Sequence, residues 1–257
     1  MLVVTDIPIP AETFVPLLAS PRPLGWVLVV AGFAAGVGTL ALAWYLSRHR
    51  SAPGATWFVA ALGAQALWAF AYTTGLLVET PTLRAFAEAL VWVGASALGP
   101  LFLAIALAYT DRSDLVRARW FPLVFVVPLV TTVLAVTFPF HGLLWQEFRL
   151  APQFGVTTVL YVVQPWGYVN TVVSLATAAS GVLLLVETVV SYGPLYRREA
   201  TAVALSTLPP ASAYVVWILG IGPWPAVNLS AAMFLPHVAL DAYAFVGTHM
   251  FETNPTT

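Results

Sequence analysis

Seven long apolar runs dominate the sequence, and each is about as long as a helix that crosses a membrane. They cover residues 24–46, 57–78, 83–109, 120–137, 166–192, 201–220 and 227–248. The hydrocarbon core of a bilayer is about 30 Å thick, and about 20 apolar helical residues cross it. Membrane-spanning strands would instead give alternating segments of about 10 residues. The runs therefore predict an all-α membrane protein, a bundle of seven transmembrane helices.

The scarcity of charge agrees with this fold class. Charged residues make up 8% of the 257 residues, against about 25% in a typical soluble domain. The net charge of −1 excludes the basic surface of a nucleic-acid-binding protein. Cysteine is absent, which excludes disulfides and cysteine ligands for metals. We expect a multi-pass protein of the plasma membrane, with the lipid bilayer as its surroundings.

Arginine supplies all ten basic charges and indicates the orientation of the bundle. The connections after the first, third and fifth runs hold Arg48, Arg50, Arg112, Arg117, Arg119, Arg197 and Arg198. The opposite side holds only Arg22, Arg84 and Arg149. Because cytoplasmic loops carry the excess of basic residues, we expect an N-out, C-in topology. Residues 1–23 are then an extracellular segment, 24–248 the transmembrane domain and 249–257 the start of a cytoplasmic linker.

The longest connection, residues 138–165, follows the fourth run and is expected outside the cell. The segment QEFRL is followed by a turn at APQFG and then by VTTVLYVV, which is rich in β-branched residues. Such a pattern favours two strands joined by a short loop. We predict a short extracellular β-hairpin between the fourth and fifth helices.

Polar and aromatic residues near the expected outer ends of the helices are candidates for a ligand site. They are Glu88, Trp92, His141, Trp145, Trp166 and Asn170. Each has a structural alternative. His141 and Trp145 also fit a helix end with a tryptophan anchored among the lipid headgroups. Glu88 also fits an ion pair with Arg84, four residues earlier, at a helix start that stands in water.

His237 and Asp241 are candidates for coupling a stimulus to the last helix. They lie well inside the last run and four residues apart, so they share a helix face. An acidic residue at this depth indicates function, because charge inside a membrane is costly. Pro236 and the Pro209–Pro210 pair should loosen the last two helices. Glu187, on the same side as Arg197 and Arg198, completes the candidates. A purely structural hydrogen bond between His237 and Asp241 remains the alternative.

Several motifs, in this order, resemble a known family over about residues 24–255. They are LVWVGASALGPLFLAIALAYTDR, TFPFHGLLW, VQPWGYV, LYRREA and MFETNPTT. They are similar to the N-terminal seven-transmembrane sensor region of bacterial and archaeal histidine kinases. The resemblance implies a sensory input module that signals through its seventh helix and works as a homodimer. One departure is Phe138, where the family often has asparagine. The chain has no phosphoacceptor helix and no nucleotide-binding boxes, so we expect no enzymatic activity. It is either the sensor part of a longer protein or a free-standing receptor that acts through a partner.

Other functions remain open or are excluded on chemical grounds. Covalent retinal requires a lysine for its Schiff base, and the chain has none, so no cofactor is expected. A metal site from His237, Asp241 and Glu187 lacks the usual paired-ligand signature, and we expect no metal. A small proton-coupled transporter is the alternative to a sensor, because charges near broken helices are typical of carriers. The segment GFAAG, with Gly32 and Gly36, allows close helix contact and is a candidate dimer face.

Overall fold

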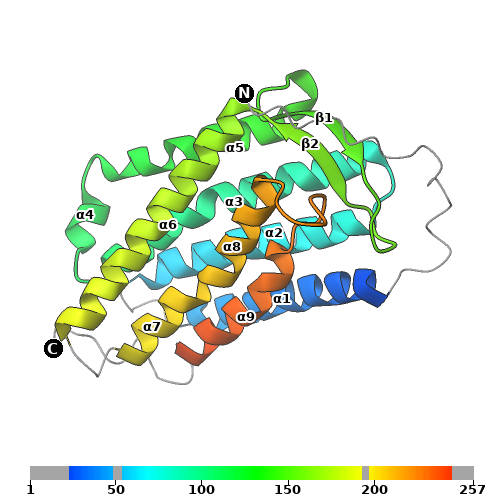
Figure 1. The fold of residues 1–257 in the computed structure, drawn as a ribbon. Coiled ribbons are helices and arrows are strands. Elements are labelled where there is room, and N and C mark those ends of the chain that lie inside the picture. The colour runs from blue at the N-terminus through cyan, green and yellow to red at the C-terminus, as the bar shows by residue number, and fades with distance from the viewer. Residues whose placement is uncertain (1–22, 49–53, 193–196, 245–257) are drawn as a thin grey trace.

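The structure is a computed structural model that describes residues 23–48, 54–192 and 197–244. Its helices are α1 (Pro23–Ser47), α2 (Ala55–Leu76), α3 (Pro81–Tyr109), α4 (Ser113–Arg117), α5 (Val126–Val136), α6 (Pro165–Tyr192), α7 (Arg197–Ser206), α8 (Leu208–Ile218) and α9 (Ser230–Ala242). The long helices lie side by side in an elongated bundle (Figure 1). The expected extracellular segment, apart from residue 23, and the expected linker 249–257 lie outside the described residues.

Each of the seven apolar runs contains a helix, which confirms an all-α membrane protein. By length and composition, five helices within the described residues can cross a membrane. They are Pro23–Ser47, Ala55–Leu76, Pro81–Tyr109, Pro165–Ser191 and Thr201–Ile218. The fourth run forms a shorter apolar helix, Phe121–Val136, whose first turn is a 3₁₀ helix with a proline near its start. The last run is described as helix only as far as Ala242.

The sixth run is interrupted at Thr207, between α7 and α8. The cause is the pair Pro209–Pro210, which stands in the first turn of α8, where prolines are tolerated. Proline has no backbone N–H, so Pro210 cannot donate to the Ser206 carbonyl one turn earlier. Within the described residues, helix α9 is continuous through Pro236, so the expected loosening appears there as a break in the sixth run and not in α9.

The two glycines of GFAAG bring α1 close to α2 of the same chain. A side chain at Gly32 would collide with Thr73, and one at Gly36 would collide with the ring of Phe70. The missing side chains at both positions therefore allow the close contact between α1 and α2 inside the bundle. The interpretation of this segment as a dimer face was wrong, because α2 already covers it.

The predicted hairpin is present. Strand β1 (Trp145–Leu150) pairs antiparallel with β2 (Val159–Val163), with an irregularity in register between Gln146 and Arg149. At the tip, Phe154 and Gly155 both have positive φ angles, as a two-residue hairpin turn requires. The hairpin lies over one end of the bundle, and α4 lies at the other end (Figure 1).

The hairpin is joined to the helices beneath it. Thr157 donates its backbone N–H to the Leu76 carbonyl at the end of α2, at 2.8 Å. The tip packs so closely on α1 that a side chain at Gly25 would collide with the Phe154 carbonyl. Phe154 also meets the edge of Trp224, in the connection between α8 and α9, at 5.2 Å between ring centroids. The hairpin thus contacts three separate parts of the helical bundle.

Candidate functional site

A buried ion pair lies beneath the hairpin, in the first turns of α3. Arg84 Nη1 is 2.9 Å from Glu88 Oε2, and the two side chains are 0% and 1% exposed. Arg84 Nε also donates to the Thr157 carbonyl of the hairpin at 3.4 Å. The ion pair was predicted correctly. Its placement in water was wrong, because the hairpin covers this end of α3.

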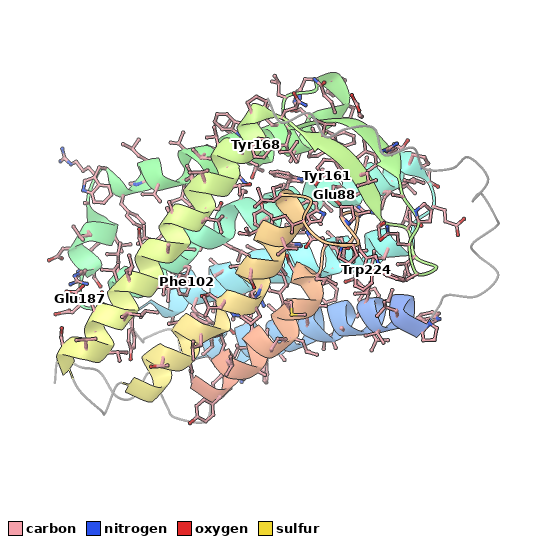
Figure 2. All side chains as sticks on the ribbon, viewed as in Figure 1. Glu88, Phe102, Tyr161, Tyr168, Glu187 and Trp224 are labelled. Atoms are coloured by element: carbon pink, nitrogen blue, oxygen red, sulfur yellow. The ribbon has the colours of Figure 1, made fainter. Side chains whose placement is uncertain are left out.

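Tyr161, on β2, connects the hairpin to this ion pair (Figure 2). Its hydroxyl donates to Glu88 Oε1 at 2.8 Å and accepts from Trp92 Nε1 at 2.9 Å. Burial, followed by the neighbouring Glu88 carboxylate, raises the pKa of Tyr161 well above its ordinary value. The hydroxyl therefore keeps its proton and remains a donor. Three other rings surround the ring of Tyr161. The centroids of Trp145, Phe148 and Trp217 lie 5.8, 5.9 and 6.0 Å from its centroid.

The structure brings several of the predicted outer residues into this aromatic cluster. Trp92 and Trp145 lie 6.2 Å apart between ring centroids, and Glu88 is joined to Trp92 through Tyr161. Trp166 packs against the same cluster, but its Nε1 donates to Thr131 Oγ1 on α5 at 3.0 Å. Sequence reasoning missed Tyr161, since a tyrosine in a strand carries no sign of its partner across the fold.

Two other predicted residues bond elsewhere. Asn170 is buried and accepts from the Thr131 hydroxyl at 3.1 Å, which ties α6 to α5. His141 bonds within its own turn: its Nδ1 accepts from the Leu143 N–H at 3.3 Å, and its Nε2 lies 2.9 Å from Thr137 Oγ1. These contacts favour a structural role for His141 over a role in ligand binding. The residue stabilises the turn at the end of the fourth run.

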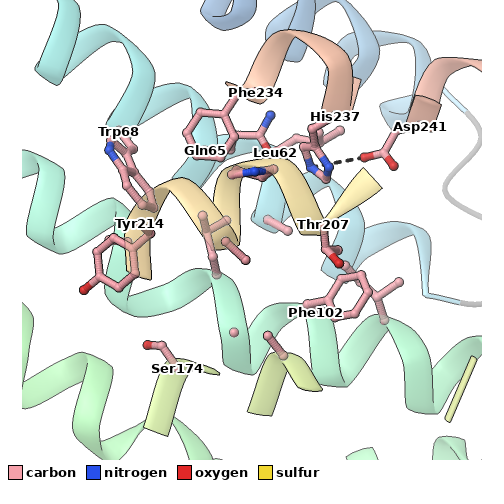
Figure 3. A pocket seen from close by; sticks show the side chains of 18 of the residues that line it. Leu62, Gln65, Trp68, Phe102, Ser174, Thr207, Tyr214, Phe234, His237 and Asp241 are labelled. Atoms are coloured by element: carbon pink, nitrogen blue, oxygen red, sulfur yellow. Dashed lines mark ion pairs between the residues drawn. The ribbon is translucent and has the colours of Figure 1, made fainter. Parts of the chain in front are cut away.

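His237 and Asp241 form the predicted pair in the interior of the bundle (Figure 3). His237 Nε2 lies 3.3 Å from Asp241 Oδ2. Both residues also hold Ser206, the last residue of α7. His237 Nδ1 is 2.9 Å from the Ser206 carbonyl, and the Ser206 hydroxyl donates to Asp241 Oδ1 at 2.7 Å. We call these three residues the clasp. Ser206 was not predicted, although its place four residues before Pro210 marks it as the residue with a freed carbonyl.

The imidazole of His237 contacts two helices at once. The Ser206 carbonyl only accepts hydrogen bonds, so His237 Nδ1, which faces it, is the donor of that bond. His237 Nε2 lies on the other side of the ring and faces Asp241 Oδ2 on its own helix at 3.3 Å.

A cavity of about 130 Å³ opens beside the clasp. It is bounded by α2, α3, α6, the α7–α8 break and α9 (Figure 3). Small residues on these elements leave the space, namely Ala61, Ala95, Gly99, Ala178 and Ala211. Most of its wall is apolar. Of the described residues that line it, only His237 and Asp241 are of charged type.

Glu187 does not join the clasp. It lies near the far end of α6 (Figure 2), is 55% exposed and pairs with Arg112 Nη2 at 2.8 Å. The side chains of Arg197 and Arg198, its expected neighbours, lie outside the described part of the chain. The exposed carboxylate of Glu187 agrees with a position near the cytoplasmic end of the helix, and its role in coupling stays a prediction. Within the described ranges, no three His, Asp or Glu side chains gather as a metal site would need.

Comparison with known proteins places the chain in a family. A family model described as the N-terminal 7TM region of histidine kinase matches residues 29–255. That match covers most of the chain, including both helices of the clasp and the hairpin. No curated protein gives a match. The resemblance inferred from the sequence motifs is confirmed, and the chain belongs to the family of N-terminal seven-transmembrane regions of histidine kinases.

Proposed function

We propose that the chain is a membrane-embedded sensory input module with seven membrane spans, its N-terminus outside and its C-terminus in the cytoplasm. Membership of the family supports the sensory role, because the matched part is the membrane region rather than a catalytic kinase domain. The distribution of arginine supports the orientation. In this topology the hairpin faces the exterior, and α4, with Arg117, faces the cytoplasm.

The clasp is the observation that carries this proposal. Helix α9, which precedes the C-terminal segment, is held to the α7–α8 break through His237 and Asp241. The Ser206 carbonyl has no helical donor, so its bond to His237 is one that a movement of α9 can break without unwinding a helix. A stimulus that favours one packing of α9 shifts the population toward it. The movement then passes to the cytoplasmic segment.

The output lies in the cytoplasm in this proposal. The family relation supports a histidine kinase or another output domain, joined to the chain or acting as a separate partner. Histidine kinases work in pairs, so we propose a homodimer as the signalling unit. The alternative is a free-standing membrane receptor that recruits a partner protein. It would use the same clasp, and it would differ from a histidine kinase only in having its output domain on a separate chain.

The test measures output from the protein in its own membranes. An immunoblot first gives the mass of the endogenous protein, and ATP-dependent phosphorylation of it and of co-purifying proteins is then measured. Asp241→Asn keeps the shape of the clasp, because an asparagine N–H can donate to His237 Nε2 and its oxygen can accept from Ser206. It removes the negative charge of Asp241. We expect at least a fivefold change in phosphorylation for Asp241→Asn and for His237→Ala.

Stability separates a signalling role from a structural one. Asp241→Asn should melt within a few degrees of the native protein in detergent, since its hydrogen bonds are replaced. Asp241→Ala leaves Ser206 and His237 without a partner and should lose about 1–3 kcal/mol, the cost of an unsatisfied buried polar group. Unchanged phosphorylation in a well-folded Asp241→Asn protein would contradict the coupling role.

A proton-coupled transporter is the second candidate, favoured by a buried His–Asp pair next to a broken helix and a cavity. Such a carrier would acidify or alkalinise liposomes when its substrate is added, and Asp241→Asn would abolish that change. A sensor leaves the internal pH constant. Pyranine fluorescence in liposomes containing the protein distinguishes the two, with empty liposomes as the control.

A further inference from the structure

The cavity beside the clasp has the features of a binding site for one class of molecule. We propose that it binds a small, uncharged, mostly apolar molecule with one hydroxyl-like donor group, in contact with the clasp. The bound molecule would be the stimulus of the sensor, and this signalling role rests on the proposed function. The binding itself is independent of signalling and is tested separately.

The size of the cavity limits the ligand. Its volume is about 130 Å³, and an apolar cavity of about 150 Å³ in a protein core is known to hold benzene. The natural occupant therefore has on the order of six to ten non-hydrogen atoms. The small side chains on facing helices keep the space open, since a close-packed interior would otherwise close it.

The wall determines the polarity of the ligand. Phe58, Leu62, Leu98, Phe102 and Phe234 present rings and aliphatic groups. Lining Arg residues are absent from the described wall, so a phosphate or carboxylate would find no counter-ion. A charged ligand would lose its hydration without compensation. The occupant must therefore be uncharged over most of its surface.

The polar side chains of the wall offer both acceptors and donors. Gln65 uses its Nε2 to donate to Thr39 at 2.9 Å, which leaves Oε1 as an acceptor. Thr207 donates its hydroxyl to the Ala204 carbonyl at 2.8 Å, which leaves the lone pairs of Oγ1. Asp241 adds a carboxylate oxygen that already faces His237. A ligand hydroxyl can donate to such groups and can also accept from the second N–H of the Gln65 amide or from Trp68 Nε1, a buried donor of a lining residue with no hydrogen-bond partner in the described part of the chain. A ligand that only accepts leaves the acceptors of the wall without a donor.

Position links the site to the clasp. Thr207 is the residue at the α7–α8 break, and His237 and Asp241 hold α9 to that break. A ligand that fills the cavity contacts both α9 and the α7–α8 break. It therefore binds best when α9 and the break are at one particular distance from each other. A ligand that binds one packing better than another shifts the population toward that packing.

Photolabelling tests the site on the full chain in lipid nanodiscs. The probe is 3-azibutanol, a small diazirine alcohol, and the labelled residues are mapped by peptide mass spectrometry. We expect labelling of cavity-lining residues on α6 and α8. Ala178→Leu fills the cavity and should reduce this labelling at least tenfold. Ala179→Leu, one residue further on the exposed face of α6, is the matched control and should stay within twofold of the native chain.

Competition tests the donor group. Benzyl alcohol and anisole are isomers of one size, and only the alcohol donates a hydrogen bond. We expect benzyl alcohol to displace the probe at a concentration at least fivefold lower. Equal competition by both, or equal labelling in Ala178→Leu and Ala179→Leu, overturns the proposal. If Ala178→Leu does not fold, Ala211→Leu fills the same space from α8 and takes its place.

The outcomes separate this inference from the sensory function. Failed labelling with an altered phosphorylation output in Asp241→Asn removes the ligand site and leaves the sensor. Specific labelling with unchanged output in Asp241→Asn keeps the site and removes its role in signalling.

Discussion

At the scale of single residues, burial decides what a charge does in this chain. Arg84–Glu88 and Arg112–Glu187 are both arginine–glutamate pairs, with separations of 2.9 and 2.8 Å. The first pair is buried under the hairpin, and the second is on the surface. A buried charge that loses its partner keeps its desolvation cost, whereas water and salt screen an exposed one. Comparing the two pairs therefore tests how burial changes the contribution of an arginine–glutamate pair to stability.

We expect Glu88→Gln to destabilise the chain strongly. The change leaves the Arg84 guanidinium without a counter-charge and gives the Tyr161 hydroxyl and Arg84 one shared acceptor in place of two. Removing one partner from a buried pair costs about 3–5 kcal/mol. Glu187→Gln should cost less than about 1 kcal/mol, as exposed pairs do. Unfolding in detergent, followed by circular dichroism, measures both, and equal losses for the two variants would contradict this account.

At the scale of elements, the long helices and the hairpin could be predicted because their signals are local. Hydrophobic length marks a spanning helix, and a β-branched segment that follows a turn marks a hairpin. The Arg84–Glu88 pair could also be predicted, since four residues on one helix set its geometry. The His237–Asp241 pair, also four residues apart on one helix, could be predicted in the same way. The contacts of Ser206, the bonds of Tyr161 and the cavity could not. The contacts of Ser206 and Tyr161 join segments that are 31 to 73 residues apart, and only packing brings those segments together.

The break between α7 and α8 is the element on which the proposed signal depends. Replacing both prolines by alanine, Pro209→Ala with Pro210→Ala, restores the N–H that the Ser206 carbonyl lacks. We expect one continuous helix and a competitor for the hydrogen bond from His237. Amide hydrogen exchange at residues 205–211 should slow at least tenfold. Pro100→Ala, in the continuous helix α3, is the control and should leave this segment unchanged. Exchange that stays fast in the double variant would show that the prolines do not cause the break.

At the scale of the whole molecule, the two ends of the bundle are built differently. One end carries the hairpin, its aromatic cluster and a buried ion pair. The other carries α4 and the surface pair of Arg112 and Glu187, at the side where arginine is most frequent. The proposed direction of signalling requires the hairpin end to face outward, so that a stimulus and the output lie on opposite sides of the membrane.

The absence of cysteine makes this orientation directly testable. A single cysteine at Gln146, on β1, or at Asp114, on α4, is then the one thiol in the chain, and both positions are exposed. We expect a membrane-impermeant maleimide to label Gln146→Cys in intact cells and Asp114→Cys only after permeabilisation, as measured by a gel shift. The opposite pattern would invert the topology, and the clasp would then pass its movement toward the exterior. Equal labelling of both positions in intact cells would be incompatible with a bundle that places its hairpin and α4 on opposite sides of one membrane.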